Sequence, residues 1–170
     1  MDIENLRLAL SYMLISKLGD MGKVQLQKYV YFLQAAYNVP VEYSFKMYHY
    51  GPYSEDLDRD MTILKLLGYI NIDRDADGYG YHLTALDEPD DDWNTIMSPY
   101  SESLENATQV FGKLSASDLE LYATIHFVND LNGEPPQQEV VNTVHSLKPK
   151  FNESTINTYY ALLQHAGLLQ

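Results

Sequence analysis

The apolar residues in the first half of this sequence change their spacing several times, and the order of these changes is compatible with few folds. Leucines recur at helical spacing over residues 3–18, and Gly19 ends the run, which predicts a first helix. A second amphipathic helix, crowded with aromatic residues, is predicted over 23–37, where Asn38-Val39-Pro40 stops it. The chain therefore begins with two consecutive helices.

A strand, a third helix and a hairpin are predicted next. Alternating side chains over 42–50 predict the strand, and Gly51-Pro52 closes it with a turn. Ser54 caps a helix that ends before Gly68. Two further strands surround an Asp-Gly turn and predict a β-hairpin, at 69–72 and 79–83. The order helix, helix, strand, helix, hairpin is the layout of a winged helix.

The second half of the chain has helical patterns and no comparable strand pattern. Five carboxylates flank Pro89 within residues 87–92 and repel one another, so we expect an acidic linker at 86–97. Helices are predicted at 98–113, at 117–131 with a capping box from Ser117 to Glu120, at 135–147, and at 153–168 with Asn152 as the cap. The expected fold class is α+β, mainly α, with a winged-helix-like domain at 1–85, the linker, and a helical region at 98–170.

Composition excludes several classes of protein. The 170 residues contain no cysteine, which excludes disulfides, thiolate nucleophiles and Cys-based zinc sites. No apolar run approaches the roughly 20 residues of a membrane span, and no basic signal peptide opens the chain, so we expect a cytoplasmic protein without a membrane partner. The net charge is −13, of which −10 lies in residues 86–170, and this disfavours nucleic acid as a partner.

No catalytic or metal-binding pattern emerges from the titratable residues. The five histidines are far apart in the sequence, and none belongs to a His-Glu-x-x-His motif. His126 and Asp130 stand four residues apart on one predicted helix face, a spacing that suits an acid/base pair but is more typical of a surface hydrogen bond. We therefore expect no enzymatic activity, no metal and no cofactor.

Tyrosine is the residue type in clear excess. Seven of the fifteen tyrosines fall within residues 29–53. Aromatic rings with a polar tip suit a surface that is both apolar and hydrated, which favours a protein-binding face. A tyrosine-rich core with hydroxyl groups reaching its rim is the alternative.

Two segments resemble a known family. They are Leu26-Gln27-Lys28 with Tyr31-Phe32-Leu33-Gln34, and Tyr48-His49-Tyr50-Gly51-Pro52-Tyr53-Ser54 followed by Leu57 and Leu64. In order and separation they resemble the YwgA-like proteins and the related Panacea domain of antitoxins and SocA-type proteolytic adaptors. The resemblance covers roughly residues 22–70. It implies a small bacterial, archaeal or phage protein that neutralises or regulates a partner by contact.

Two functional hypotheses follow, with different contact residues. In the first, the protein is an antitoxin-like adaptor that binds a protein partner through Gln27, Lys28, Tyr31, Tyr48, His49, Tyr50 and Tyr53. In the alternative, a winged-helix transcriptional regulator contacts DNA through Lys23, Lys28, Ser54, Arg59 and Arg74. The third helix begins with four carboxylates and one arginine, which opposes DNA binding, although a homodimer would align the scattered lysines.

Overall fold

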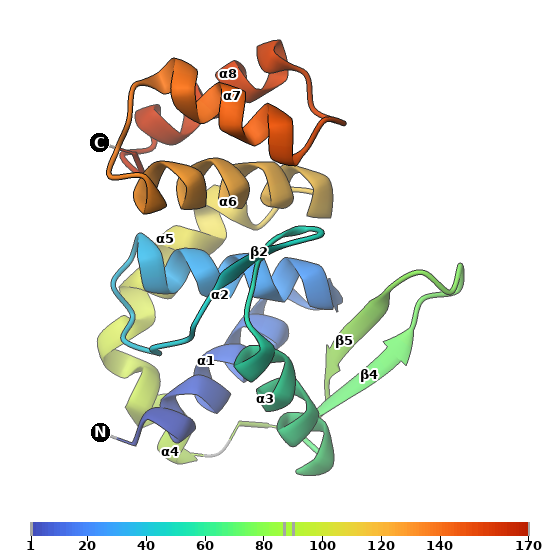
Figure 1. Cartoon of the computed structure of the whole chain (residues 1–170). Coiled ribbons are helices and arrows are strands. Elements are labelled where there is room, and N and C mark those ends of the chain that lie inside the picture. The colour runs from blue at the N-terminus through green and yellow to red at the C-terminus, as the bar shows by residue number, and fades with distance from the viewer. Residues whose placement is uncertain (1, 87, 90, 170) are drawn as a thin grey trace.

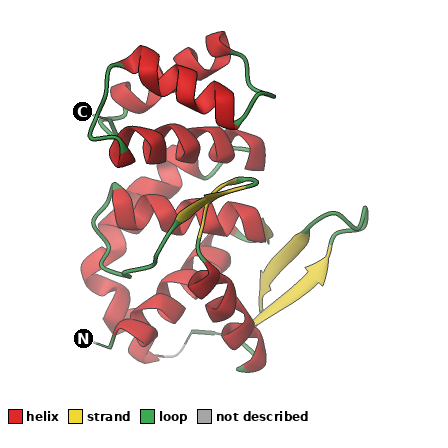
Figure 2. Cartoon of the chain, in the orientation of Figure 1, coloured by secondary structure: helices red, strands yellow, loops and turns green. Residues whose placement is uncertain are grey.

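The protein has a mainly helical α+β fold with two small antiparallel sheets (Figures 1 and 2). It is represented by a computed structural model, and the described residues are 2–86, 88–89 and 91–169. No helix in these ranges has the length and apolar character needed to cross a membrane. The expected fold class is confirmed at this level.

The two N-terminal helices form as predicted. Helix α1 (Ile3–Leu18) begins where the Asp2 carboxylate accepts a hydrogen bond from the backbone N–H of Glu4, and it ends at Gly19, whose φ is 74°. Strand β1 (Met21–Gly22) follows and leads directly into α2 (Lys23–Ala35). Helix α2 is buried at eight consecutive positions from Leu26 to Leu33, because other elements cover it on every side.

The predicted strand at 42–50 is largely wrong. Only β2 (Lys46–Tyr48) is extended in a sheet, and it pairs with β3 (Gly51–Tyr53), so Gly51-Pro52 is part of a strand and the turn lies at His49-Tyr50. Side chains of the first two helices bind the backbone that precedes β2. Arg7 donates to the carbonyls of Val41 and Glu42 at 2.6 Å each. The Gln34 side-chain amide donates to the carbonyl of Tyr43 and accepts from its N–H.

The third helix and the predicted hairpin are confirmed. Helix α3 (Glu55–Leu66) begins at Ser54, whose hydroxyl accepts from the backbone of Leu57. Strands β4 (Ile70–Arg74) and β5 (Tyr81–Ala85) pair antiparallel, and β1 adds to the other side of β5, which gives the strand order β1-β5-β4. The β4–β5 hairpin, called the wing below, projects from the helical body (Figure 1).

The expected acidic linker contains a packed helix. Helix α4 (Asp91–Met97) places Trp93 and Met97 four residues apart, so both reach the core, and α4 packs against α1. The Trp93 ring centroid lies 4.5 Å from that of Tyr69 and 5.6 Å from that of Tyr12. Aromatic burial therefore outweighs charge repulsion in this segment. Asp87 and Asp90 of the acidic run lie outside the described residues.

The remaining helices match the prediction in position, with changes at their starts. A short 3₁₀ turn (Ser98–Tyr100) precedes α5 (Ser101–Phe111), and α6 (Ala116–Leu131), α7 (Gln137–Leu147) and α8 (Glu153–His165) follow. Asn152 caps α8 as predicted. The capping box of α6 joins Ser115 to Asp118, not Ser117 to Glu120, because Glu120 points into the protein.

One hydrophobic core runs through both halves of the chain. Helix α2 lies between α1 on one side and α6 on the other, with α7 and α8 beyond α6 (Figure 1). Phe32 of α2 stacks on Phe111 of α5 at 4.3 Å between ring centroids, and this joins the two halves at the centre. The stacked layers hold the β2–β3 hairpin against α2 and α6, and they position it beside the wing.

Candidate functional site

The structure brings the two family-like segments into direct contact. The Gln27 side chain donates to the carbonyl of Ser54 at 2.9 Å and accepts from the N–H of Ser54 at 2.8 Å. Lys28 Nζ donates to the carbonyl of Pro52 at 2.6 Å. Helix α2 thus clamps the β2–β3 hairpin and the start of α3 through side chain to backbone bonds.

Three of the residues that we expected to contact a partner are buried at this clamp or beside it. Gln27, Lys28 and Tyr31 are only 2%, 1% and 4% exposed. Their position on a helix that is covered on all sides turns their polar ends toward internal acceptors. Gln27 and Lys28 still line the cavity between the β2–β3 hairpin and the wing, whereas Tyr31 does not.

Tyr31 and His126 form a buried pair. The Tyr31 hydroxyl lies 2.7 Å from His126 Nδ1, so this nitrogen faces Tyr31 and not Asp130. Burial raises the pKa of Tyr31 and lowers the pKa of His126. His126 is therefore part of the contact between α2 and α6. It does not form the surface hydrogen bond to Asp130 that their spacing suggested.

A buried charge cluster holds the tip of the β2–β3 hairpin. The Glu120 carboxylate lies 3.4 Å from Lys148 Nζ and 2.6 Å from Lys150 Nζ. Lys148 also donates to the carbonyls of Tyr48 and His49. Burial, aided by the charge of Lys148 and opposed by that of Glu120, lowers the pKa of Lys28 to about 7. The sequence carries no local sign of this cluster, because its members come from three distant segments.

Gly51 lies where a side chain would crowd its neighbours. Its φ is +88°, and a Cβ would lie 3.0 Å from Thr124 Oγ1 and 3.3 Å from the carbonyl oxygen of Glu120. Thr124 cannot yield easily, since its hydroxyl donates to the same carbonyl at 2.7 Å. We expect Gly51→Ala to lower the free energy of unfolding by about 2 to 4 kcal/mol, from backbone strain and overpacking together.

Gly133→Ala provides the matched control for this prediction. Gly133 also has positive φ, at +67°, but a Cβ there would meet nothing within 4 Å. We expect it to lose only the conformational part, about 1 to 2 kcal/mol. Urea denaturation of both variants measures the difference, and equal losses would show that the close packing of β3 on α6 carries no energetic weight.

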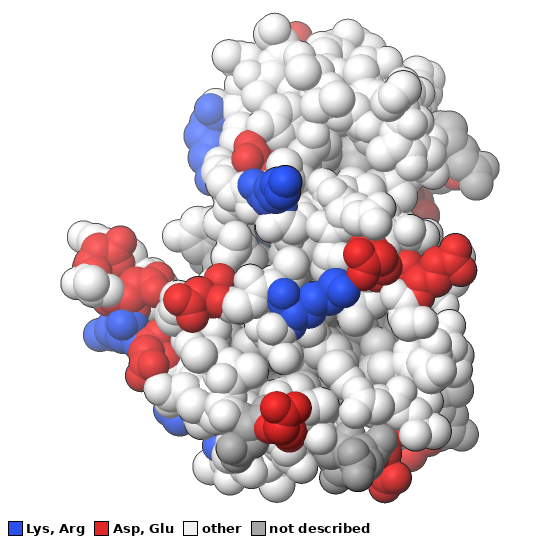
Figure 3. Space-filling view, turned by 180° about the vertical axis from the view of Figure 1, so that it is seen from behind, with Lys and Arg blue, Asp and Glu red and all other residues white. Residues whose placement is uncertain are grey.

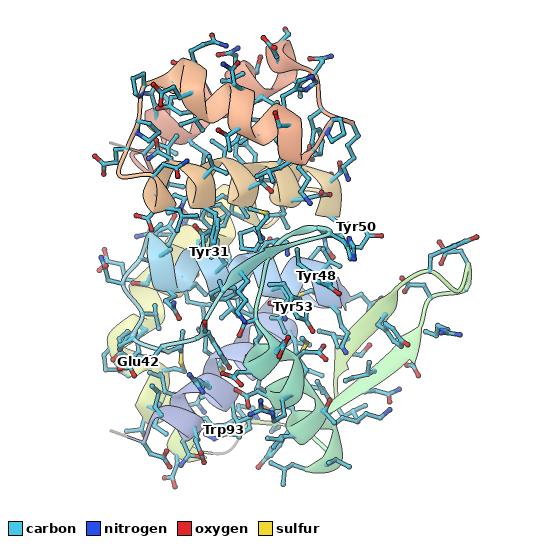
Figure 4. All side chains as sticks on the ribbon, viewed as in Figure 1. Tyr31, Glu42, Tyr48, Tyr50, Tyr53 and Trp93 are labelled. Atoms are coloured by element: carbon cyan, nitrogen blue, oxygen red, sulfur yellow. The ribbon has the colours of Figure 1, made fainter. Side chains whose placement is uncertain are left out.

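A groove of about 700 Å³ separates the β2–β3 hairpin from the wing. Its rings come from both sides, with Tyr48, Tyr50 and Tyr53 from the hairpin and Tyr79 and Tyr81 from the wing. Figure 4 shows the three hairpin tyrosines along the side of the body that faces the wing. Tyr79, Tyr48 and Tyr50 are 94%, 59% and 56% exposed, and His49 at the hairpin tip is exposed as well. These residues form the tyrosine groove.

The groove brings together most of the residues that the sequence predicts as partner contacts. Tyr48, His49, Tyr50 and Tyr53 were proposed as contacts, and the structure brings all four to the groove. Tyr79 and Tyr81 were missed. Their spacing of two residues near a strand gives both side chains the same face, and that signal was available in the sequence.

The residues of the DNA-binding alternative are engaged within the protein. Lys23 pairs with Asp58 at 2.8 Å and Arg59 with Asp56 at 2.7 Å. Ser54 and Lys28 are buried, and the Arg74 guanidinium lies 5.8 Å from the ring centroid of Tyr81. The face seen in Figure 3 shows Lys and Arg interspersed with Asp and Glu, without a broad basic area in the part that is described. These five residues do not form a basic surface.

Across residues 2–86, 88–89 and 91–169, no three His, Asp or Glu side chains are grouped so that they could hold a metal ion. No protein-family model matches the sequence, and a search of curated proteins finds no match. The function is therefore inferred from the tyrosine groove itself.

Proposed function

We propose that this protein is a non-enzymatic, antitoxin-like adaptor that binds a protein partner in the tyrosine groove. The observation that carries the proposal is the exposure of Tyr48, Tyr50 and Tyr79 on facing sides of one cavity. Exposed tyrosines grouped in this way are typical of protein interfaces, because each ring offers a large apolar area and a hydroxyl at little cost in conformational entropy. The resemblance of the clamp segments to Panacea-type antitoxins and adaptors supports the same class.

A winged-helix-like arrangement of residues 1–85 is part of the proposal. Its support is the order α1, β1, α2, α3, β4, β5, with β1 beside β5 in the sheet. In DNA-binding members of that class, the helix equivalent to α3 enters the major groove. Here the first turn of α3 carries Glu55, Asp56 and Asp58, so its charge favours a protein partner over DNA.

The test is capture of a partner by tagged protein, with and without nuclease. We expect a protein that survives nuclease treatment and is captured at least tenfold less by a Tyr50→Ala/Tyr79→Ala double variant. Both side chains are exposed, so the circular dichroism spectrum should not change. Leu162→Ala is the control, because it removes an exposed apolar side chain on α8, away from the groove.

Two results would reject this function. Undiminished capture by the double variant would remove the tyrosine groove from partner binding. Recovery of nucleic acid, lost after nuclease and weakened by Lys23→Ala or Arg74→Ala, would establish the DNA-binding regulator instead.

A further inference from the structure

The geometry points to one kind of occupant for the tyrosine groove, and we propose that it receives an extended polypeptide segment carrying arginine or lysine side chains. This inference rests on the proposed function and specifies the chemistry of the partner. Three features support it, namely the charge of the groove walls, the use of the tyrosine rings, and the free side of β5.

The groove walls carry more accessible negative than positive charge. Asp20 and Asp75 flank His82 on the wing side, with carboxylate to imidazole distances of 3.2 and 4.0 Å. Asp73 and Asp77 are further exposed carboxylates on the wing, where Figure 3 shows acidic residues among uncharged ones.

The cations beside the groove are already occupied. Lys23 is paired with Asp58, Lys28 is buried under the hairpin, and Arg74 lies over Tyr81. A basic segment would therefore meet Asp20 and Asp75, which pair with no lysine or arginine among the described residues, whereas an acidic segment would be repelled.

The tyrosine rings near the groove already accept cations from the protein. Lys23 Nζ lies 5.2 Å from the ring centroid of Tyr81, and Lys150 Nζ lies 5.8 Å from that of Tyr50. These distances are within the roughly 6 Å over which a cation is attracted to an aromatic face. Among the described residues, no lysine or arginine lies over Tyr48 or Tyr79 in this way. Their exposed rings can take the cations of a partner.

The wing leaves room for an extended backbone. Strand β1 pairs only with Leu83 and His82 of β5, because the chain turns into α2 directly after Gly22. On that side Tyr81 has no strand partner in the described part of the chain, and Tyr81 lines the groove. An extended segment can continue the line of β1 there, as in recognition by strand addition. Its alternate side chains would then face the tyrosine rings.

The test uses fluorescence anisotropy with three labelled peptides of equal length. In the first, Arg alternates with Ser, and in the others Gln or Glu replaces every Arg. We expect the Arg peptide to bind at least tenfold more tightly than the Gln peptide, and the Glu peptide to show no binding. Added salt should weaken binding of the Arg peptide, because the carboxylates on the wing are exposed.

Variants then locate the binding to this groove. Asp20→Asn/Asp75→Asn should weaken the Arg peptide about three- to tenfold, and Tyr79→Ala about two- to fivefold. Glu139→Gln is the matched control, because it removes one exposed negative charge on α7, outside the groove, and should have no effect.

Failure of this inference is separable from failure of the proposed function. Equal affinity for the Arg and Gln peptides would overturn the basic segment. If no peptide binds but partner capture still depends on Tyr50 and Tyr79, the inference of a basic segment is overturned. The adaptor function would stand in that case. Loss of that tyrosine dependence would overturn both proposals.

Discussion

Glu120→Ala is expected to lower the free energy of unfolding by about 3 to 5 kcal/mol, the usual cost of removing one partner from a buried ion pair. Glu120 and Lys148 are both buried, and the carboxylate is the counter-charge for the Lys148 ammonium. The carbonyls of Tyr48 and His49 remain as acceptors in the variant, but they carry no full charge. The variant would leave a buried cation without its counter-charge.

The measurement is urea denaturation near neutral pH, with Lys150→Ala as the control. Lys150 pairs with the same carboxylate, yet its side chain is 54% exposed, so we expect a loss of at most about 1 kcal/mol. The double variant Glu120→Met/Lys148→Met should recover much of the stability lost in Glu120→Ala, since an apolar pair replaces the charges. Equal losses in the free energy of unfolding for Glu120→Ala and Lys150→Ala would show that the buried pair of Glu120 and Lys148 is no more important for stability than the exposed one.

The charge cluster also connects stability to the tyrosine groove. Lys148 binds the hairpin at Tyr48 and His49, two of the residues proposed to meet the partner. Loosening this contact should therefore make the groove less preorganised. Weaker partner capture is expected in Glu120→Ala even where the protein remains folded, because the binding would then have to order the hairpin.

Trp93→Ala should lower the free energy of unfolding by about 3 to 5 kcal/mol, as expected for truncation of a large aromatic side chain in a core. Trp93 is only 5% exposed and packs against both Tyr12 and Tyr69. The loss can be measured by urea denaturation followed by circular dichroism. Because Trp93 is the single tryptophan, the emission of the unmutated protein should also shift to longer wavelength on unfolding.

Leu86→Ala is the control for the Trp93 prediction. Leu86 lies in the same predicted linker, but its side chain is mostly exposed, so we expect a change within about 0.5 kcal/mol. If Trp93→Ala also changed stability by so little, the segment at 91–97 would behave as a solvated linker, and the packing of α4 on α1 would be refuted.

Local patterns in the sequence were sufficient for several elements. The helix at 3–18, the wing and the Asn152 cap were predicted correctly because each depends on neighbouring residues, namely apolar spacing, an Asp-Gly turn, and a side chain that bonds a nearby N–H. Of the seven proposed contact residues, six line the groove and Tyr31 does not, the six being Gln27, Lys28, Tyr48, His49, Tyr50 and Tyr53.

Long-range contacts decided the rest. Where the sequence predicts a strand from residue 42, the backbone is bound instead by Arg7, which is 35 residues from Glu42, and by Gln34, which is nine residues from Tyr43. Gln27 and Lys28 form a buried clamp for the same kind of reason, with acceptors 27 and 24 residues away, respectively.

The sequence by itself determined the order of most elements, the acidity and the concentration of tyrosine. Only the tertiary structure decided which tyrosines face one another across a groove and which polar groups are buried beneath it. The physical reason is that periodicity and capping act over a few residues, whereas burial and ion pairing depend on segments that meet only after folding, as Glu120 meets Lys148.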